Sequence, residues 1–524
     1  MKYFSLGAAL LCVVFSWASA QEHAHPIAAT QEKLGTVHFV TSCNPAVAGD
    51  FNRATALLHS FEFAAAIKGF QSVLAADSTC AMAHWGIALS RWSNPMAVGN
   101  RAPQPLQQGR IEADAAKRLG TRATDRERGY IDAVSKLYDN HETVGQRNRV
   151  VAYEQAMADL VAKEPADTEA KIFYAISLAA SASPTDKTYS NQRKAGSMLE
   201  ALWEKQPTHP GLAHYIIHSY DYPALAPEAA AAARKYASIA PSAAHAQHMP
   251  SHIFTRTGYW RESIETNLKS IDIALSTGSI AEALHASDYA EYAYLQRRDY
   301  ANAKRIVDGL PALAARFDPT AVTGAAPGSA GVFALAAIPA RFALERDAWS
   351  EAAALQPAAT AFPWTDAMTH LARALGASHT RDFAKARMSI DSLTAIRDRL
   401  AARDEPYWSE QVAIQRLSAQ AWLDLARGNT DSALAHMNEA VRREDATEKN
   451  AVTPGPLAPA RELSGDMLMQ LRRPADALSE YKKVLANEPN RRRSLEAGIR
   501  AAAAVRDRNL EAAFRAKLKS ISGK

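Results

Sequence analysis

The chain has 524 residues, of which 60 are Lys or Arg and 55 are Asp or Glu, so its formal charge is only +5. Basic and acidic residues are interspersed, which is typical of solvated helix faces and argues against a nucleic-acid-binding surface. The densest basic run, Arg491 to Arg493, is therefore expected to be an ordinary exposed segment.

Residues 1–20 are predicted to form a secretory signal peptide, because Lys2 precedes an apolar run that ends in the small residues Ala18, Ser19 and Ala20. Removal of Lys2 with this segment leaves a formal charge of +4. The apolar run is shorter than the ~20 residues of a membrane helix, and no later stretch reaches that length, so no transmembrane segment is predicted. We expect an exported protein, periplasmic or secreted, with a flexible mature N-terminus over residues 21–36.

Two cysteines, Cys43 and Cys80, remain after the signal peptide. In an exported chain such a pair predicts one disulfide, which would join the first predicted helical hairpin to the next. Two free buried thiols are the alternative.

The rest of the chain is predicted to be all-α, because apolar residues recur at spacings of three and four and sustained alternation is almost absent. Near the C-terminus Gly465, Ala477, Tyr481 and Pro489 fall at positions 8, 20, 24 and 32 of a 34-residue unit. That pattern resembles the tetratricopeptide repeat (TPR), in which helical hairpins stack into a right-handed superhelical solenoid.

Two repeat blocks are predicted, over residues 37–317 and 364–524. Between them, residues 318–363 read as a connection rich in Gly, Pro and Ala that contains helical pieces.

Two pairs of histidines repeat at the spacing of one TPR unit. His214 and His248 are 34 residues apart, as are His218 and His252, and each pair has i,i+4 spacing. Both imidazoles of a pair therefore share one helix face.

Several further motifs are similar to a bacterial family of exported TPR proteins of unassigned function. The segments that carry this resemblance lie between residues 36 and 300, and they are 38–43, 57–61, 80–86, 209–214 and 248–254. The resemblance implies a fold and a compartment but no reaction.

In TPR proteins generally, positions 2, 5 and 9 of the first helix line a concave groove that holds ligands. By this register we expect a groove to be lined by His245, His285, Asp288 and Tyr292 together with the nearby Arg256 and Trp260. The leading hypothesis is an exported TPR binding protein whose groove recognises a protein segment or a small ligand.

The alternative is a metalloprotein, catalytic or not. Here His214, His218, His248 and His252 would hold one divalent ion such as Zn²⁺, Cu²⁺ or Fe²⁺, with Asp288 or His285 completing or orienting the shell. A third option is that the histidine pairs serve packing alone. Sequence motifs of common hydrolases, nucleotide-binding enzymes and zinc proteases are missing, so no catalytic residue is assigned.

Overall fold

The computed structural model describes residue 1 and residues 32–97, 101–183 and 185–522. Apart from Met1, the predicted signal peptide lies outside the described residues, as does the predicted flexible segment up to residue 31. The chain divides into two units, residues 1–32 and 33–524. Everything below concerns the second unit.

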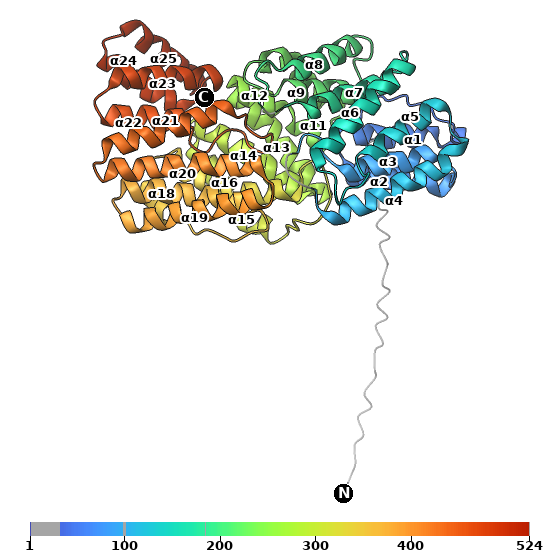
Figure 1. Ribbon diagram of the computed structural model, residues 1–524, viewed down its shortest axis with the longest axis horizontal. Helices are drawn as coiled ribbons and strands as arrows, with labels where there is room; N and C mark the ends of the chain where they lie inside the picture. Colours follow the sequence, from blue (N-terminus) through green and yellow to red (C-terminus); the bar gives the residue numbers. More distant parts are fainter. Residues whose placement is uncertain (2–31, 98–100, 184, 523–524) are drawn as a thin grey trace. The chain divides into compact units, whose positions relative to one another are not determined.

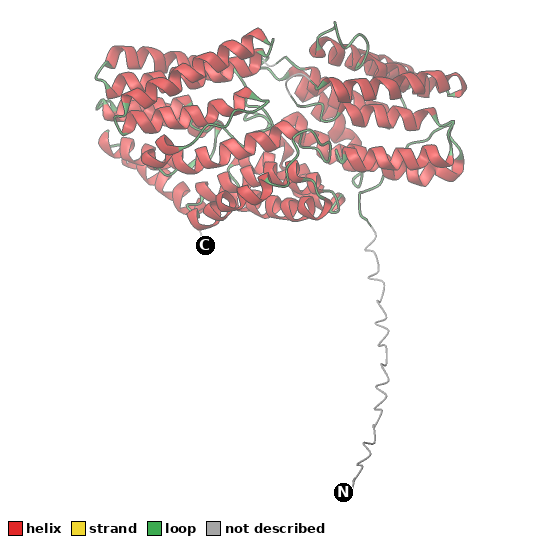
Figure 2. Ribbon diagram, turned by 90° about the horizontal axis from the view of Figure 1, so that it is seen from below, coloured by secondary structure: helices red, strands yellow, loops and turns green. Residues whose placement is uncertain are grey.

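Helices account for nearly all the regular structure of the described residues, and strands are absent from them (Figures 1 and 2). The first half contains η1 (Pro45–Val47), α1 (Ala48–His59), α2 (Phe63–Ala76), α3 (Ala81–Trp92), α4 (Pro103–Leu119), η2 (Gly120–Arg122), α5 (Asp125–Lys136), α6 (Gln146–Lys163), α7 (Thr168–Ser181), α8 (Ser190–Trp203), α9 (Pro210–Tyr220), η3 (Ala226–Ala229), α10 (Ala230–Ile239), α11 (Ala244–His248) and α12 (Pro250–Thr257).

The second half contains α13 (Trp260–Thr277), α14 (Ile280–Gln296), α15 (Tyr300–Ala314), α16 (Gly328–Leu344), α17 (Trp349–Ala354), α18 (Pro363–His379), α19 (Phe383–Ala402), α20 (Pro406–Ala426), α21 (Thr430–Ala446), α22 (Ala460–Gln470), α23 (Pro474–Asn487), α24 (Arg492–Ala504) and α25 (Arg508–Ile521). No helix among the described residues is both long and apolar enough to cross a membrane.

The prediction of an all-α, TPR-like solenoid is confirmed. Most helices pack against the next in the chain, and first helices of neighbouring hairpins also touch, as α7 touches α9 and α14 touches α16. The repeat positions explain the close approach of paired helices. A Cβ atom on Gly465 in α22 would lie 2.5 Å from the ring of Tyr481 in α23, so only glycine fits there.

The predicted connection over residues 318–363 is partly helical. A loop follows α15, and α16 and α17 both lie within the segment. Residues 33–524 form one compact unit, in which one large apolar cluster is built mainly from residues 34–254 and another from residues 333–467.

Residues 33–36, which we expected in the flexible N-terminus, are bound to the solenoid. The amide of Thr36 donates to the carbonyl of Thr208 at 3.0 Å, and the amide of Ser242 donates to the carbonyl of Lys33 at 3.2 Å. Leu34 is buried beside them. The ordered part of the chain thus begins earlier than predicted.

The basic run Arg491 to Arg493 was predicted to be exposed, and that prediction is wrong. The Arg491 side chain is fully buried and donates to Glu345 at 2.7 Å and to Glu462 at 2.8 Å. Its third partner is the hydroxyl of Tyr292 in α14, at 2.7 Å. A buried guanidinium needs such partners, and these bonds tie the last hairpins to the middle of the chain.

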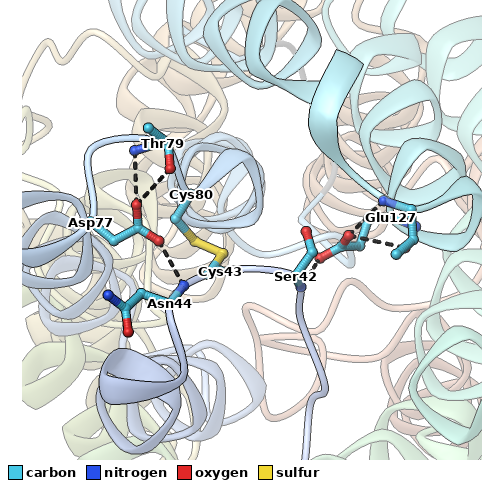
Figure 3. Close-up of a disulfide and its surroundings, with 8 residues drawn as sticks. Ser42, Cys43, Asn44, Asp77, Thr79, Cys80 and Glu127 are labelled. Atoms are coloured by element: carbon cyan, nitrogen blue, oxygen red, sulfur yellow. Dashed lines mark hydrogen bonds between the residues drawn. A yellow bond between two sulfur atoms is a disulfide. The ribbon is translucent and has the colours of Figure 1, made fainter.

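The predicted disulfide is present, and Figure 3 shows its surroundings. Cys43 precedes η1, and Cys80 is the residue before α3, so the bond joins the start of one hairpin to the start of the next. Beside it, the Asp77 carboxylate accepts hydrogen bonds from the amides of Asn44 at 2.8 Å and Thr79 at 3.0 Å (Figure 3).

We expect the Cys43→Ala/Cys80→Ala variant to lose about 2–4 kcal/mol of unfolding free energy, because the cross-link restricts the unfolded chain. Urea titration followed by circular dichroism measures this. Reductant should lower the wild type to the level of the variant and leave the variant unchanged. Equal stability of the oxidised wild type and the variant would contradict a stabilising role.

Candidate metal centre

Four short stretches of helix bring six histidines together. His214 and His218 lie on α9, His245 and His248 on α11, His252 on α12 and His285 on α14. Pro250 has no amide hydrogen, and the structure divides the predicted single helix just before it, into α11 and α12. All six side chains are buried, with exposed fractions of 6% or less.

The six histidines form two triplets. The first triplet is His214, His218 and His245, and the second triplet is His248, His252 and His285. Within each triplet one ligand nitrogen per residue lies within 4.8 Å of the other two. We expected His214, His218, His248 and His252 around one ion, whereas the structure divides these four between the two triplets.

The first triplet has three nitrogens without partners. His214 Nδ1 lies 2.6 Å from the carbonyl oxygen of His59, and His245 Nδ1 lies 3.0 Å from the Glu282 carboxylate. Both acceptors require Nδ1 to carry the proton, so Nε2 of each ring is a bare lone pair. Among the described residues, Nε2 of His214, His218 and His245 is buried and has no hydrogen-bond partner.

The second triplet holds two lone pairs face to face. His248 Nδ1 lies 2.7 Å from Asn267 Oδ1, and His252 Nδ1 lies 2.9 Å from the Asp221 carboxylate. The amide nitrogen of Asn267 donates to the carbonyl of Ser263, which identifies its oxygen as the acceptor for His248. When both rings are neutral, the two Nε2 atoms therefore both lack protons, yet they are 3.0 Å apart. Two lone pairs at that distance repel unless a cation lies between them.

The pKa values of these imidazoles favour the ligand form. Burial is the main cause, because it penalises the charged ring, and it lowers the pKa of His248 to about 3. Burial and the neighbouring rings also hold the pKa of His214, His218 and His285 well below the ordinary 6.5. For His252 burial again lowers the pKa, although Asp221 opposes it. Neutral imidazole binds metal ions.

In each triplet, a buried carboxylate accepts a hydrogen bond from one histidine. Burial acts to raise the pKa of Glu282, but its interaction and hydrogen bond with His245 outweigh burial and lower the pKa to about 2. Asp221 is held ionised in the same way by Lys449 and Arg256, which outweigh its burial and keep its pKa well below 3.8. Such an outer carboxylate orients a ligating histidine and makes it a stronger donor.

A third cluster, His59, Glu169 and His209, is closed by its own hydrogen bonds. One carboxylate oxygen of Glu169 lies 2.9 Å from His59 Nε2, and the other lies 3.0 Å from His209 Nε2. The nitrogens that a metal would need are thus already paired, so we assign this cluster a structural role. It fixes His59, whose carbonyl holds His214.

The six residues predicted to line an open groove are all buried, and three of them, Arg256, Trp260 and Tyr292, line a cavity. His245 and His285 belong to the triplets, and Arg256 donates to Asp221 at 2.9 Å. Trp260 Nε1 donates to the carbonyl of Asn490 at 3.0 Å, and Tyr292 accepts from Arg491. Residues of the C-terminal hairpins pack against Trp260 and Tyr292.

Asp288, predicted to complete a metal shell, pairs with a guanidinium instead. Arg341 of α16 is fully buried, donates to Asp288 and lies 3.6 Å from Glu291. Burial raises the pKa of Asp288, with Arg341 acting against it. Asp288 therefore forms an ion pair with Arg341 and not a contact with the histidines.

Sequence reasoning missed the grouping and the outer acceptors. The register did contain the grouping: His245 and His285 occupy position 2 of units that directly follow the histidines at positions 5 and 9. The acceptors Asp221 and Glu282 each lie three residues from a histidine of the cluster, His218 and His285, which was a usable signal. No sequence signal indicated that His59 and Asn267 would act as acceptors.

Three cavities lie around the triplets. The smallest, about 40 Å³, borders His218 and His245 of the first triplet and His252 and His285 of the second. A cavity of about 200 Å³ shares His218 and Asn450 with it. The third, about 510 Å³, is lined by three predicted groove residues, Arg256, Trp260 and Tyr292.

The loop between α21 and α22, residues 447–459, forms walls of all three cavities, and we call it the capping loop. Its carbonyls at Ala451 and Thr453 accept hydrogen bonds from Tyr289 at 2.9 and 3.0 Å. Lys449 of this loop lies 3.7 Å from Asp221. The C-terminal block therefore closes a centre whose histidines all lie in the N-terminal block.

No protein-family model and no curated protein matches the sequence. Among solved structures, a human IFIT1 dimer with m7Gppp-AAAA is 11% identical, with a TM-score of 0.40, over 85% of this chain and 90% of that one. Yeast Tom70 is 14% identical, with a TM-score of 0.38, over 88% and 96%. The fold assignment rests on the helices themselves and not on these similarities.

We expect the metal-free protein to lose stability as the pH falls from about 7.5 to 5.5. Burial lowers the folded pKa of five histidines, so the unfolded chain, with pKa near 6.5, binds more protons, and stability present above that value is lost below it. The five are His214, His218, His248, His252 and His285. Each such histidine lowers the free energy of unfolding by about 1 kcal/mol at pH 5.5. Urea titrations of chelator-treated protein at several pH values measure the slope.

His248→Gln should reduce the slope of unfolding free energy against pH by the contribution of one histidine. His38→Gln, at an exposed position, should leave the slope unchanged. A stability independent of pH over this range would show that the buried rings are not neutral in the folded state.

Proposed function

We propose that this chain is a metalloprotein that binds two transition-metal ions, one in each triplet. The observation that carries the proposal is the convergence of buried imidazole nitrogens, two of them 3.0 Å apart on rings whose Nδ1 atoms already have acceptors. Lone pairs packed this way cost free energy in the empty protein, and a cation reverses the sign of that interaction.

The ligand set indicates the class of ion. Each triplet offers three neutral nitrogens, and a metal–nitrogen bond of about 2.0–2.1 Å suits the tight spacing of the rings. Imidazole suits zinc and copper, while the common three-residue site for non-haem iron includes a carboxylate, which neither triplet contains. Three protein ligands also leave a coordination position free for a small ligand.

We keep export, to the periplasm or outside the cell, as part of this proposal. The Cys43–Cys80 disulfide supports it, because disulfides persist in oxidising compartments.

Metal content per chain tests the proposal directly. We expect the purified or reconstituted wild type to hold two equivalents of zinc or copper by plasma mass spectrometry. His214→Ala and His248→Ala should each lose about one equivalent, and the double variant should lose both, because each histidine belongs to a different triplet. Metal binding should also raise the melting temperature, since the unfolded chain lacks the site.

The matched control is His84→Ala. His84 is paired with Glu112 outside both triplets, so this variant should keep both equivalents. A wild type that holds no metal after reconstitution, or single variants with unchanged content, would overturn the proposal.

A second candidate continues the prediction of ligand recognition. The cavity of about 510 Å³ is lined by Arg256, Trp260 and Tyr292, and by further residues of both charge signs, including Lys187, Arg461 and Glu488. A ligand with both charges, such as a short peptide, matches this lining.

For this candidate we expect an unmodified dipeptide, such as Ala-Ala or Lys-Glu, to raise the melting temperature of the wild type by a few degrees and that of Trp260→Ala by much less, because the indole forms part of the wall. Thermal unfolding at millimolar dipeptide measures the shift. Equal shifts in the two proteins, or none in either, would reject the candidate.

A further inference from the structure

We infer that the two triplets form one copper pair that binds dioxygen between its two ions. This inference rests on the proposed function and adds the identity of the metal and the class of ligand. Four observations support it: the closeness of the triplets, the cavity that they share, the donors around that cavity and its size.

The two triplets are adjacent and share one short helix. His245 of the first triplet and His248 of the second lie on α11, with ring centroids 5.9 Å apart. His218 and His252 face each other from α9 and α12 at 6.4 Å. Two ions held by these rings would therefore be direct neighbours, able to bind one ligand together.

The smallest cavity lies where such a shared ligand would bind. Two histidines of each triplet border it, as do the apolar residues Met249, Ala330 and Trp364. Its volume is about 40 Å³. A single water needs about 10–15 Å³ measured in this way, so there is room for a diatomic molecule and not for a larger substrate.

The donors favour copper over zinc. Neither triplet includes a carboxylate ligand, and the thioether side chains of Met96 and Met249 line the cavity. Neutral imidazole and thioether are donors that suit Cu(I), whereas zinc has no redox chemistry. Hydrolysis at a zinc ion would also require a substrate larger than the shared cavity of about 40 Å³ can hold.

Two Cu(I) ions supply all the electrons that dioxygen accepts in this step. Each Cu(I) ion gives one electron, so two ions reduce bound dioxygen to the peroxide level and become Cu(II). The O–O bond order falls from two to one, two copper–oxygen bonds form, and no proton or further reductant is needed. Release of dioxygen returns both electrons to the ions.

Dioxygen can approach through the neighbouring cavity. The cavity of about 200 Å³ meets the small one at Met96, His218 and Asn450. Asn450 belongs to the capping loop, so this loop borders the path as well as the site.

The test uses the full mature chain, stripped of metal and loaded with Cu(I) under nitrogen. We expect two copper ions per chain and, after exposure to dioxygen, uptake of one dioxygen per chain measured with an oxygen electrode. A new near-ultraviolet charge-transfer band should appear without a Cu(II) signal in electron paramagnetic resonance, because two bridged Cu(II) ions couple. Removal of dioxygen under vacuum should reverse the band.

Three variants test whether dioxygen uptake occurs at the shared cavity. His285→Ala should keep one copper ion and take up no dioxygen reversibly, because a pair is required. Ala330→Leu should keep both ions and lose most of the uptake, because the added side chain fills the cavity. His84→Ala should behave as the wild type.

Each outcome separates this inference from the proposed function. Two bound copper ions without dioxygen uptake, or retention of zinc with refusal of Cu(I), would overturn the copper pair and leave the metalloprotein intact. Unchanged uptake in both His285→Ala and Ala330→Leu would overturn the shared site. A chain that binds no metal at all would reject both proposals. If His285→Ala does not fold, the wild-type stoichiometry and the resonance spectrum still decide.

Discussion

The arrangement of the centre depends on one constraint, the assignment of each Nδ1 proton to a fixed acceptor. His214, His245, His248 and His252 give these protons to a carbonyl, a carboxylate, an amide oxygen and a second carboxylate. The acceptors come from α1, α14, α13 and the end of α9. Because they leave the Nε2 lone pairs converging in a water-poor space, the helices around the cluster must pack closely enough to hold mutually repelling groups in place.

Elsewhere in the solenoid, buried acceptors surround a positive charge. Between α14 and α16 that charge is the Arg341 guanidinium beside Asp288 and Glu291. Further along, Arg491 takes the same role with Glu345, Glu462 and Tyr292. The two triplets lie earlier in the chain, on α9 to α14, and there histidines take the place of the acids. The repeat therefore offers the same position to arginine in one unit and, by our proposal, to a metal ion in another.

Repeat spacing was enough to predict the helical fold and the two histidine pairs, because both depend on contacts within one hairpin or between neighbours. The disulfide was predicted from the cysteine count in a chain expected to be exported. Burial of the predicted groove could not be predicted in this way. It results from contacts between residues far apart in the chain, such as Trp260 with Asn490 and Tyr292 with Arg491. The prediction that Arg491 to Arg493 are exposed was wrong for the same reason, because the acidic partners of Arg491 are far away in the chain, at Glu345 and Glu462. The division into triplets was within reach of the register, but it required treating position 2 as a ligand position.

The capping loop has a consequence for biosynthesis. All six histidines and their acceptors have been synthesised by residue 285, whereas the loop that walls the cavities begins at residue 447. A nascent or translocating chain therefore exposes a complete set of ligands while well over a hundred residues are still to follow. Under our proposal, the order of metal binding and loop closure decides which ion is trapped, so the bound metal would depend on where the last hairpins fold.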